Sequence, residues 1–212
     1  MWSAELFGTV SFFLHLAAYG MYAVQVLGER VKPNVAAWLM WVFGGVVEWQ
    51  TYDHMTNSHW SSSLLPLACV IGLGFITTAI VVTYWRNRGT GRETYHRPKF
   101  QDWAFVSFDV AAGALWWVWD MPEEANALAV ATTIVTFIPI WRTTWHEPQG
   151  ENPWMWLTWC WAYMFMLGAV IMNGGDNLLW QGFYPVYYLV LHLVVAMICL
   201  RTVARQNVMP AE

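Results

Sequence analysis

The sequence predicts an all-α integral membrane protein with seven transmembrane helices. Its 212 residues are 58% hydrophobic and only 11% charged, whereas a soluble domain carries about 25% charged residues. Apolar stretches close to the roughly 20 residues that cross a bilayer recur along the chain. Charged residues also sort by sign between alternate connections, as they do in multi-pass membrane proteins. Together these observations argue against an ordinary soluble domain.

Seven apolar segments are separated by polar connections. With the N-terminus outside, all ten basic residues fall on the inner side, and the outer turns carry acidic residues instead. This is the positive-inside pattern, and an error of one span would destroy it. We therefore expect a multi-pass protein in the lipid bilayer of the cytoplasmic (inner) membrane, with its N-terminus outside and its C-terminus inside. The predicted spans are residues 5–27, 34–52, 64–85, 102–121, 124–145, 154–172 and 180–200.

The connections support this division. The first inner turn is basic and leads into Pro33, which opens the second span. The longest inner segment, 86–101, combines five basic residues with glycine and proline and reads as a linker between two halves. The outer turn at 120–124 is very short, so the fourth and fifth spans are expected to be antiparallel neighbours.

A proline followed by two tryptophans three residues apart occurs once in each half of the chain. The two copies are Pro33 with Trp38 and Trp41, and Pro153 with Trp156 and Trp159. Spans one to three thus correspond to spans five to seven, which predicts two parallel three-helix repeats joined by a linker helix (3+1+3) and related by an axis along the membrane normal. The expected divisions are 1–85 for the first repeat, 86–121 for the basic cytoplasmic linker and inversion helix, 122–205 for the second repeat and 206–212 for the C-terminal tail.

This layout resembles the PQ-loop superfamily, which includes the SWEET sugar transporters and cystinosin-like carriers. The Pro-Gln signature is split between the halves, because one half keeps Gln25 and the other keeps Pro139. More closely, the chain is similar to a group of bacterial PQ-loop-like membrane proteins with a Lys-Pro…Trp-x-x-Trp element, here Lys32, Pro33, Trp38 and Trp41. The resemblance implies a small-solute transporter that works by alternating access.

Two acidic residues are the clear cases of a charged group at membrane depth within a predicted span. Glu48 lies in the second span and Asp109 in the fourth, close to its middle. A charge at the centre of a membrane helix costs about 2.5–3.5 kcal/mol on insertion scales, so such residues face the bundle interior and mark a pathway. Our hypothesis is that one of them binds and releases a proton in coupled transport. The alternative for Glu48 is a residue near the outer end that reaches the interface.

A small-molecule solute is expected near the midplane, between the two three-helix units. The tryptophans would form the walls of its pathway, a tyrosine and a histidine would supply polar contacts, and the two acids would tune the charge. SWEET carriers hold sugar with paired asparagines in the third helix of each repeat, and the residues present here make a sugar doubtful. The predicted pathway residues are Trp41, Glu48, Asp109, Trp159, Tyr188 and His192.

Four further residues are candidates for gating or hinge motion, namely Gln25, Pro33, Pro139 and Pro153. A proline inside a helix removes a hydrogen bond and favours a kink. A kink at Pro139, near the inner end of its span, could let the helix open and close a pathway. A proline that only bends the helix would look the same in the sequence.

His15 and His192 lie in the middle of the first and last spans. Each is more commonly a hydrogen-bonded core residue, and the functional alternatives are a proton relay or axial ligation of a haem or chlorin. This leaves a second class of function open: a non-transporting subunit of a larger membrane complex, with or without a pigment, or a membrane sensor. Without a pigment no cofactor is expected, and the chain could also form a homo-oligomer.

Other functions lack their sequence signals. A retinal protein needs a lysine within the bundle, and both lysines, Lys32 and Lys99, fall in inner connections. Asp53, His54 and His59 crowd one outer turn, which we interpret as a solvated turn rather than a metal site. No nucleophile or phosphate-binding motif is present, so we expect no enzyme activity. The basic segment suits topology and anionic lipids better than nucleic acid.

Overall fold

The computed structural model describes residues 3–31, 33, 35–56, 59–92, 94, 100–146, 151–174 and 178–208. Within these residues the chain forms seven α-helices, and each predicted span falls on one of them. The helices are α1 (Ala4–Leu27), α2 (Val35–Met55), α3 (Trp60–Asn87), α4 (Phe100–Trp117), α5 (Pro122–His146), α6 (Pro153–Asn173) and α7 (Leu178–Val208). The all-α prediction is confirmed for the described part of the chain.

Five helices are long and apolar enough to cross a bilayer: α1, α3, α5, α6 and the Leu178–Arg201 part of α7. The chain is therefore a helical membrane protein. Helices α2 and α4 are not among these five, and they carry the buried acids Glu48 and Asp109. That α2 and α4 also cross the membrane stays a prediction.

Local sequence explains where several helices begin and end. Ser3 caps α1 by accepting a hydrogen bond from the Leu6 amide (3.3 Å), and Asn152 caps α6 by accepting one from the Trp154 amide (3.0 Å). Pro153 follows at the first helical position, where its missing N–H costs nothing. Asp120 adopts a left-handed conformation (φ 55°) after α4, which turns the chain sharply into α5.

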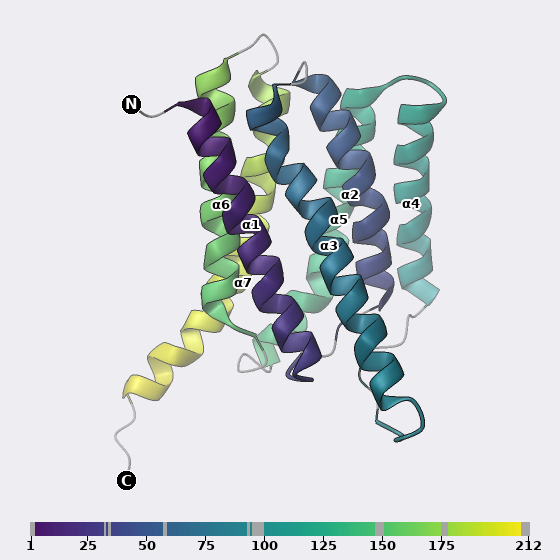
Figure 1. Ribbon diagram of the computed structural model, residues 1–212, viewed down its shortest axis with the longest axis vertical. Helices are drawn as coiled ribbons and strands as arrows, with labels where there is room; N and C mark the ends of the chain where they lie inside the picture. Colours follow the sequence, from purple (N-terminus) through teal and green to yellow (C-terminus); the bar gives the residue numbers. More distant parts are fainter. Residues whose placement is uncertain are drawn as a thin grey trace.

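The helices pack in the same order in both halves of the chain (Figure 1). In the first half, α3 lies between α1 and α2 and contacts both. In the second half, α7 lies between α5 and α6 and contacts both. The halves meet through two reciprocal pairs, α1 with α6 and α5 with α2, and through a smaller contact between α3 and α6. Helix α4 lies outside against α2 and α5.

Small residues allow the closest helix crossings, as is usual between membrane helices. At Gly8 of α1, an added Cβ atom would lie only 2.1 Å from the backbone oxygen of Ser61 on α3. At Gly72 of α3, the same position is filled by the ring of Tyr19 from α1. These two glycines account for the intimate α1–α3 contact.

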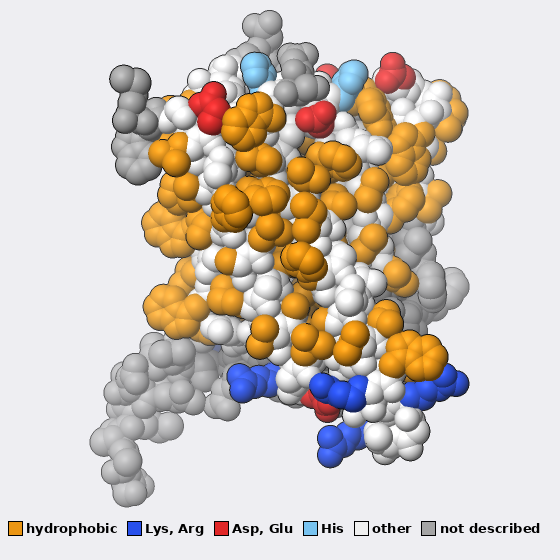
Figure 2. Space-filling model, in the orientation of Figure 1, with side chains coloured by type: hydrophobic (Ala, Val, Ile, Leu, Met, Phe, Trp, Pro, Cys, Tyr) orange, Lys and Arg blue, Asp and Glu red, His pale blue; other side chains and the backbone are white. Residues whose placement is uncertain are grey.

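The two ends of the bundle differ in charge. We use "upper end" for the end that holds the start of α1 and the α2–α3 turn, and "lower end" for the opposite one, as in Figure 1. On the face shown in Figure 2, lysine and arginine side chains gather at the lower end and a broad apolar belt lies above them. Acidic side chains occur mostly at the upper end, and Glu29 is an exception among the basic residues.

Candidate functional site

A cavity lies inside the bundle, and all seven helices contribute to its wall. It begins about halfway along the helices and extends toward the lower end, because its residues come from the lower half of α2 and from the middle of α5 and α6. The volume of the cavity is about 50 Å³. This is room for a few water molecules or one small solute.

The structure brings six sequence-predicted residues to this one cavity. They come from α2, α4, α6 and α7, and all of them contribute to its wall: Trp41, Glu48, Asp109, Trp159, Tyr188 and His192. Glu48 is 5% exposed, so in this structure it is not a residue reaching the surface of the bundle. The role of each residue in a transport pathway stays a prediction.

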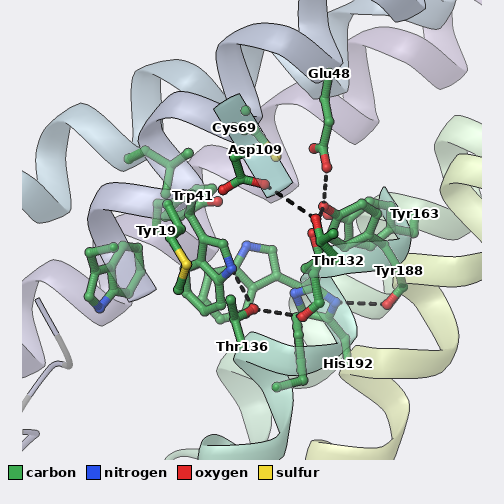
Figure 3. Close-up of a pocket in the computed structure, with 18 of the residues that line it drawn as sticks. Tyr19, Trp41, Glu48, Cys69, Asp109, Thr132, Thr136, Tyr163, Tyr188 and His192 are labelled. Carbon is green, nitrogen blue, oxygen red and sulfur yellow. Dashed lines mark hydrogen bonds between the residues drawn. The ribbon is translucent and has the colours of Figure 1, made fainter. Parts of the chain in front are cut away.

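The Glu48 carboxylate is joined to the second half of the chain by a short hydrogen bond. The Tyr188 hydroxyl on α7 donates to Glu48 Oε1 at 2.6 Å, and the same hydroxyl lies 3.0 Å from Thr133 Oγ1 on α5. Figure 3 shows this junction at one side of the cavity. Hydrogen bonds to a charged group are among the stronger ones, so Tyr188 fixes where the carboxylate sits.

Asp109 faces the same cavity from α4. Thr132 on α5 donates to Asp109 Oδ1 at 3.2 Å. A Cβ atom at Gly44 of α2 would lie 3.6 Å from the Asp109 carboxylate, so glycine leaves the room that this side chain occupies. Gly44 is one helical turn from Glu48 on the same face of α2. Both acids are therefore arranged along one face of α2.

Tryptophan pairs from both halves form the lower wall. The rings of Trp38 and Trp41 are 4.8 Å apart, and those of Trp156 and Trp159 are 5.0 Å apart. Trp41 donates through Nε1 to Thr136 Oγ1 on α5 at 2.7 Å, which ties α2 to α5. Both pairs line the cavity.

The two predicted histidines occupy different places. His192 lines the cavity, and its Nδ1 lies 2.7 Å from the Tyr188 carbonyl oxygen. A carbonyl can only accept, so Nδ1 carries a proton and Nε2 of the neutral ring keeps a lone pair. His15 is buried beside the cavity, with Nε2 3.0 Å from Cys69 Sγ and no hydrogen-bond partner for Nδ1 among the described residues.

A haem or chlorin does not fit this arrangement. The centroids of the Phe137, Trp156, Trp159 and Tyr163 rings all lie within 5.1–5.4 Å of the His192 ring. His15 is enclosed in the same way, by Tyr19 and Tyr163 at 5.1 and 5.3 Å. Neither imidazole faces a space that could take a porphyrin-sized plane, so the side chains present do not support the pigment-binding alternative.

Gln25, Pro33 and Pro153 lie at the lower end and are not among the lining residues of the cavity. Gln25 Nε2 makes a long contact with Met155 Sδ (3.8 Å), which links the end of α1 to the start of α6. Pro33 is buried just before α2, and Pro153 begins α6. Pro139 lies within α5, and its side chain falls outside the described part.

The outer-turn residues make no metal centre in the described part of the chain. No group of three metal-ligating side chains occurs there. His54 packs against the Trp116 ring at 5.2 Å. Cys69, Cys160 and Cys199 are buried as free thiols.

Sequence reasoning missed the polar side of α5. Thr132, Thr133 and Thr136 all line the cavity. Threonines in a membrane helix often bond their own backbone, as Thr132 and Thr133 also do to the Ala129 carbonyl oxygen, and so they give no functional signal in a sequence. Tyr163 was also missed, although it follows Trp156 and Trp159 at helical spacing, and that period could have found it.

One more carboxyl lies just below the cavity. Glu151 precedes α6, and its Oε2 accepts a hydrogen bond from Trp156 Nε1 at 3.0 Å. Burial raises the pKa of this carboxyl from 4.5 to about 7, and the Trp156 hydrogen bond opposes part of that rise. Trp156 also lines the cavity, so Glu151 contacts the cavity wall from below.

No family model, no curated protein and no solved structure matches this chain. Its resemblance to the PQ-loop superfamily stays a prediction from the sequence.

Proposed function

We propose that this chain is a small-solute carrier of the PQ-loop-like type that works by alternating access in the cytoplasmic membrane. The observation that carries the proposal is the cavity, which lies between two three-helix units of matching order and holds two buried carboxylates. Carriers built from repeats bind their solutes near the midplane at the interface between the repeats.

Several residues of the cavity wall occupy equivalent positions in the two proposed repeats. Both tryptophan pairs lie at the same place in α2 and α6. Four further lining residues lie three and seven positions after the proline inside α3 or α7. These are Cys69 and Leu73 after Pro66, and Tyr188 and His192 after Pro185. Equivalent positions facing one space support a 3+1+3 arrangement of parallel repeats.

Hydrogen bonds join the two halves of the chain above the cavity. Asn173 on α6 donates to the hydroxyls of Ser61 (2.9 Å) and Ser62 (2.7 Å) on α3. Tyr52 on α2 donates to the Gln181 carbonyl oxygen on α7 at 2.7 Å. The basic lower end favours an inward orientation for that end, so we interpret this state as closed to the outside.

Alternating access can be tested before any solute is known. In a variant without Cys69, Cys160 and Cys199, a cysteine introduced at Leu73 would report from the cavity. Sealed vesicles of both orientations would be treated with a membrane-impermeant thiol reagent. We expect reaction from either side. A cysteine at Phe75, whose ring is 51% exposed on the bundle surface, should react from neither side.

A cross-link makes the same test sharper. Cysteines at Ser62 and Asn173, whose side chains touch, should form a disulfide that holds the upper end closed. Oxidation should then abolish labelling at position 73 from the upper side and spare it from the lower side, and reduction should restore it. Access from one side only, without the cross-link, would refute the carrier and favour a static subunit or a sensor.

Proton coupling is the finer part of the proposal. Glu48 and Asp109 are the acids that the cavity presents. Once a transported solute is in hand, uptake should depend on pH in the unmodified protein, and the dependence should be lost in Glu48→Gln or Asp109→Asn. If both variants kept the same pH dependence, neither acid could be the coupling group.

A further inference from the structure

The cavity presents two carboxyl groups without a basic partner. Glu48 and Asp109 contribute to its wall, and no lysine or arginine does. The ion pairs found among the described residues both lie at the lower end, at Glu29. His192 donates through Nδ1 to the Tyr188 carbonyl oxygen in this arrangement. A buried carboxyl stays ionised only when something pairs with it, and the described residues supply no basic side chain here.

Each carboxylate also keeps one oxygen for a ligand. Tyr188 donates to Oε1 of Glu48, and Thr132 donates to Oδ1 of Asp109. Among the described residues no donor reaches Oε2 of Glu48 or Oδ2 of Asp109. Both oxygen atoms keep some accessible surface. These oxygens are the acceptors available for a group that enters the cavity.

The rest of the wall is largely aromatic. Six tyrosine and tryptophan rings surround the space below the acids: Tyr19, Trp38, Trp41, Trp156, Trp159 and Tyr163. Aromatic faces attract cations within about 6 Å of the ring centre, and ammonium groups in particular. A bare metal ion would instead require several oxygen ligands, which ring faces cannot provide.

The rest of the ligand is expected to carry no negative charge. A carboxylate on the ligand would lie close to Glu48 and Asp109 with no lysine or arginine among the lining residues to balance it, so an uncharged body fits better.

We infer that the cavity takes a small organic cation: an ammonium group on a short, mostly apolar and otherwise uncharged body. The ammonium lies between the free oxygens of Glu48 and Asp109 and the aromatic rings. The volume of about 50 Å³ restricts the body to a few heavy atoms in this conformation. This inference names the solute class of the carrier proposed above and rests on that proposal.

The test is binding to the full-length protein in lipid nanodiscs, measured by calorimetry. The probes are protonated 2-aminoethanol and tetramethylammonium, compared at equal ionic strength with tert-butanol, acetate, glycine and sodium ion. We expect saturable binding of both ammonium compounds and none of the four comparison solutes. This comparison uses the unmodified protein, so it does not depend on the folding of any variant.

Variants then locate the binding. Glu48→Gln and Asp109→Asn should each weaken ammonium binding at least tenfold, which is about 1.4 kcal/mol. Glu124→Gln, at an exposed carboxyl in the first turn of α5, is the matched control and should leave it unchanged.

Failure of this inference can be told apart from failure of the carrier. Binding of tert-butanol, acetate, glycine or sodium ion at least as tight as that of the ammonium probes would overturn the cation inference, and so would unchanged affinity in both acid variants. Absence of binding by both ammonium probes would also overturn it. Labelling of the cavity cysteine from both sides would leave the carrier standing in each of these cases.

Discussion

The upper and lower halves of the bundle are held together by different means. Above the cavity, small and polar residues bring the helices close, with Gly8 against the Ser61 backbone and Asn173 bonded to two serine hydroxyls. Below it, large rings fill the space between the helices. The Trp41 ring donates one short hydrogen bond to Thr136 there, and Gln25 makes a long contact with Met155 between α1 and α6.

This difference suggests which half can move. Interhelical hydrogen bonds have fixed directions and short reach, so the upper contacts either hold or break. Stacked and tilted rings bury much surface and tolerate several geometries. The lower half can therefore change the shape of the cavity more gradually. The proposed gating would break contacts at the upper end and slide rings at the lower end.

The largest expected effect comes from forcing the upper crossing apart. In Gly8→Ala the added methyl group meets the Ser61 backbone oxygen, so α1 and α3 must separate. We expect a loss of about 1–3 kcal/mol in the free energy of unfolding, measured by thermal or denaturant unfolding in detergent. Gly20→Ala in the same helix is the control, because nothing lies within 4 Å of its added Cβ. That control should be neutral or up to about 1 kcal/mol more stable. Equal effects of the two changes would contradict the described crossing.

A smaller effect is expected from the hydrogen bonds of the upper end. Asn173→Leu keeps the size of the side chain and removes both bonds to α3, each worth about 0.5–1.5 kcal/mol. The upper end should open more often, so the cysteine at position 73 should react from that side about tenfold faster. Thr78→Val is the control, since its hydroxyl bonds the Gly74 carbonyl oxygen within its own helix. An unchanged rate would mean that these bonds do not restrain opening.

The helices and the two cavity acids could be predicted because each depends on local properties of the chain. Apolar runs and the sign of charge in the connections locate the helices. Glu48 and Asp109 stand out because a charge within an apolar run is costly wherever its helix packs. Both signals are independent of which helices are neighbours.

The polar partners could not be predicted in the same way. Thr132 and Thr133 matter because α5 packs beside α2, α4 and α7, and the sequence of α5 does not state that. Glu151 lies in a polar segment between two helices, where a solvated carboxyl is the natural expectation. Its burial results from the residues that fold over it, among them Trp156.

Glu151 gives the lower end a pH dependence. Its pKa is raised from 4.5 to about 7 by burial in the folded protein. As pH rises from about 4.5 to 7, the unfolded chain loses this proton first, so the free energy of unfolding falls and stays lower above pH 7. Glu151→Gln removes the effect. Relative to the unmodified protein, the variant should gain about 1 kcal/mol at pH 8, a partial effect because the carboxyl is only half-buried. At pH 4.5 and below the gain should vanish. A gain independent of pH would contradict the burial of this carboxyl.

The smallest effect is expected at Glu29, which is exposed at the same end. Asn87 and Arg86 donate to Glu29 Oε1 at 2.9 and 2.6 Å, and these contacts hold the pKa of the carboxyl below its ordinary value. Its contribution to stability is therefore present above the ordinary carboxyl pKa and is lost as pH falls through the folded value. Glu29→Gln should lower the unfolding temperature slightly at neutral pH and low salt, and the difference should disappear in acid and in 1 M salt, where exposed charges are screened. Arg86→Gln should cost more, because Arg86 also donates to the Leu27 carbonyl oxygen at the end of α1 (2.8 Å). If Glu29→Gln proved as costly as Gly8→Ala, the lower end would depend on fixed polar contacts as much as the upper end does, and the contrast between them would fail.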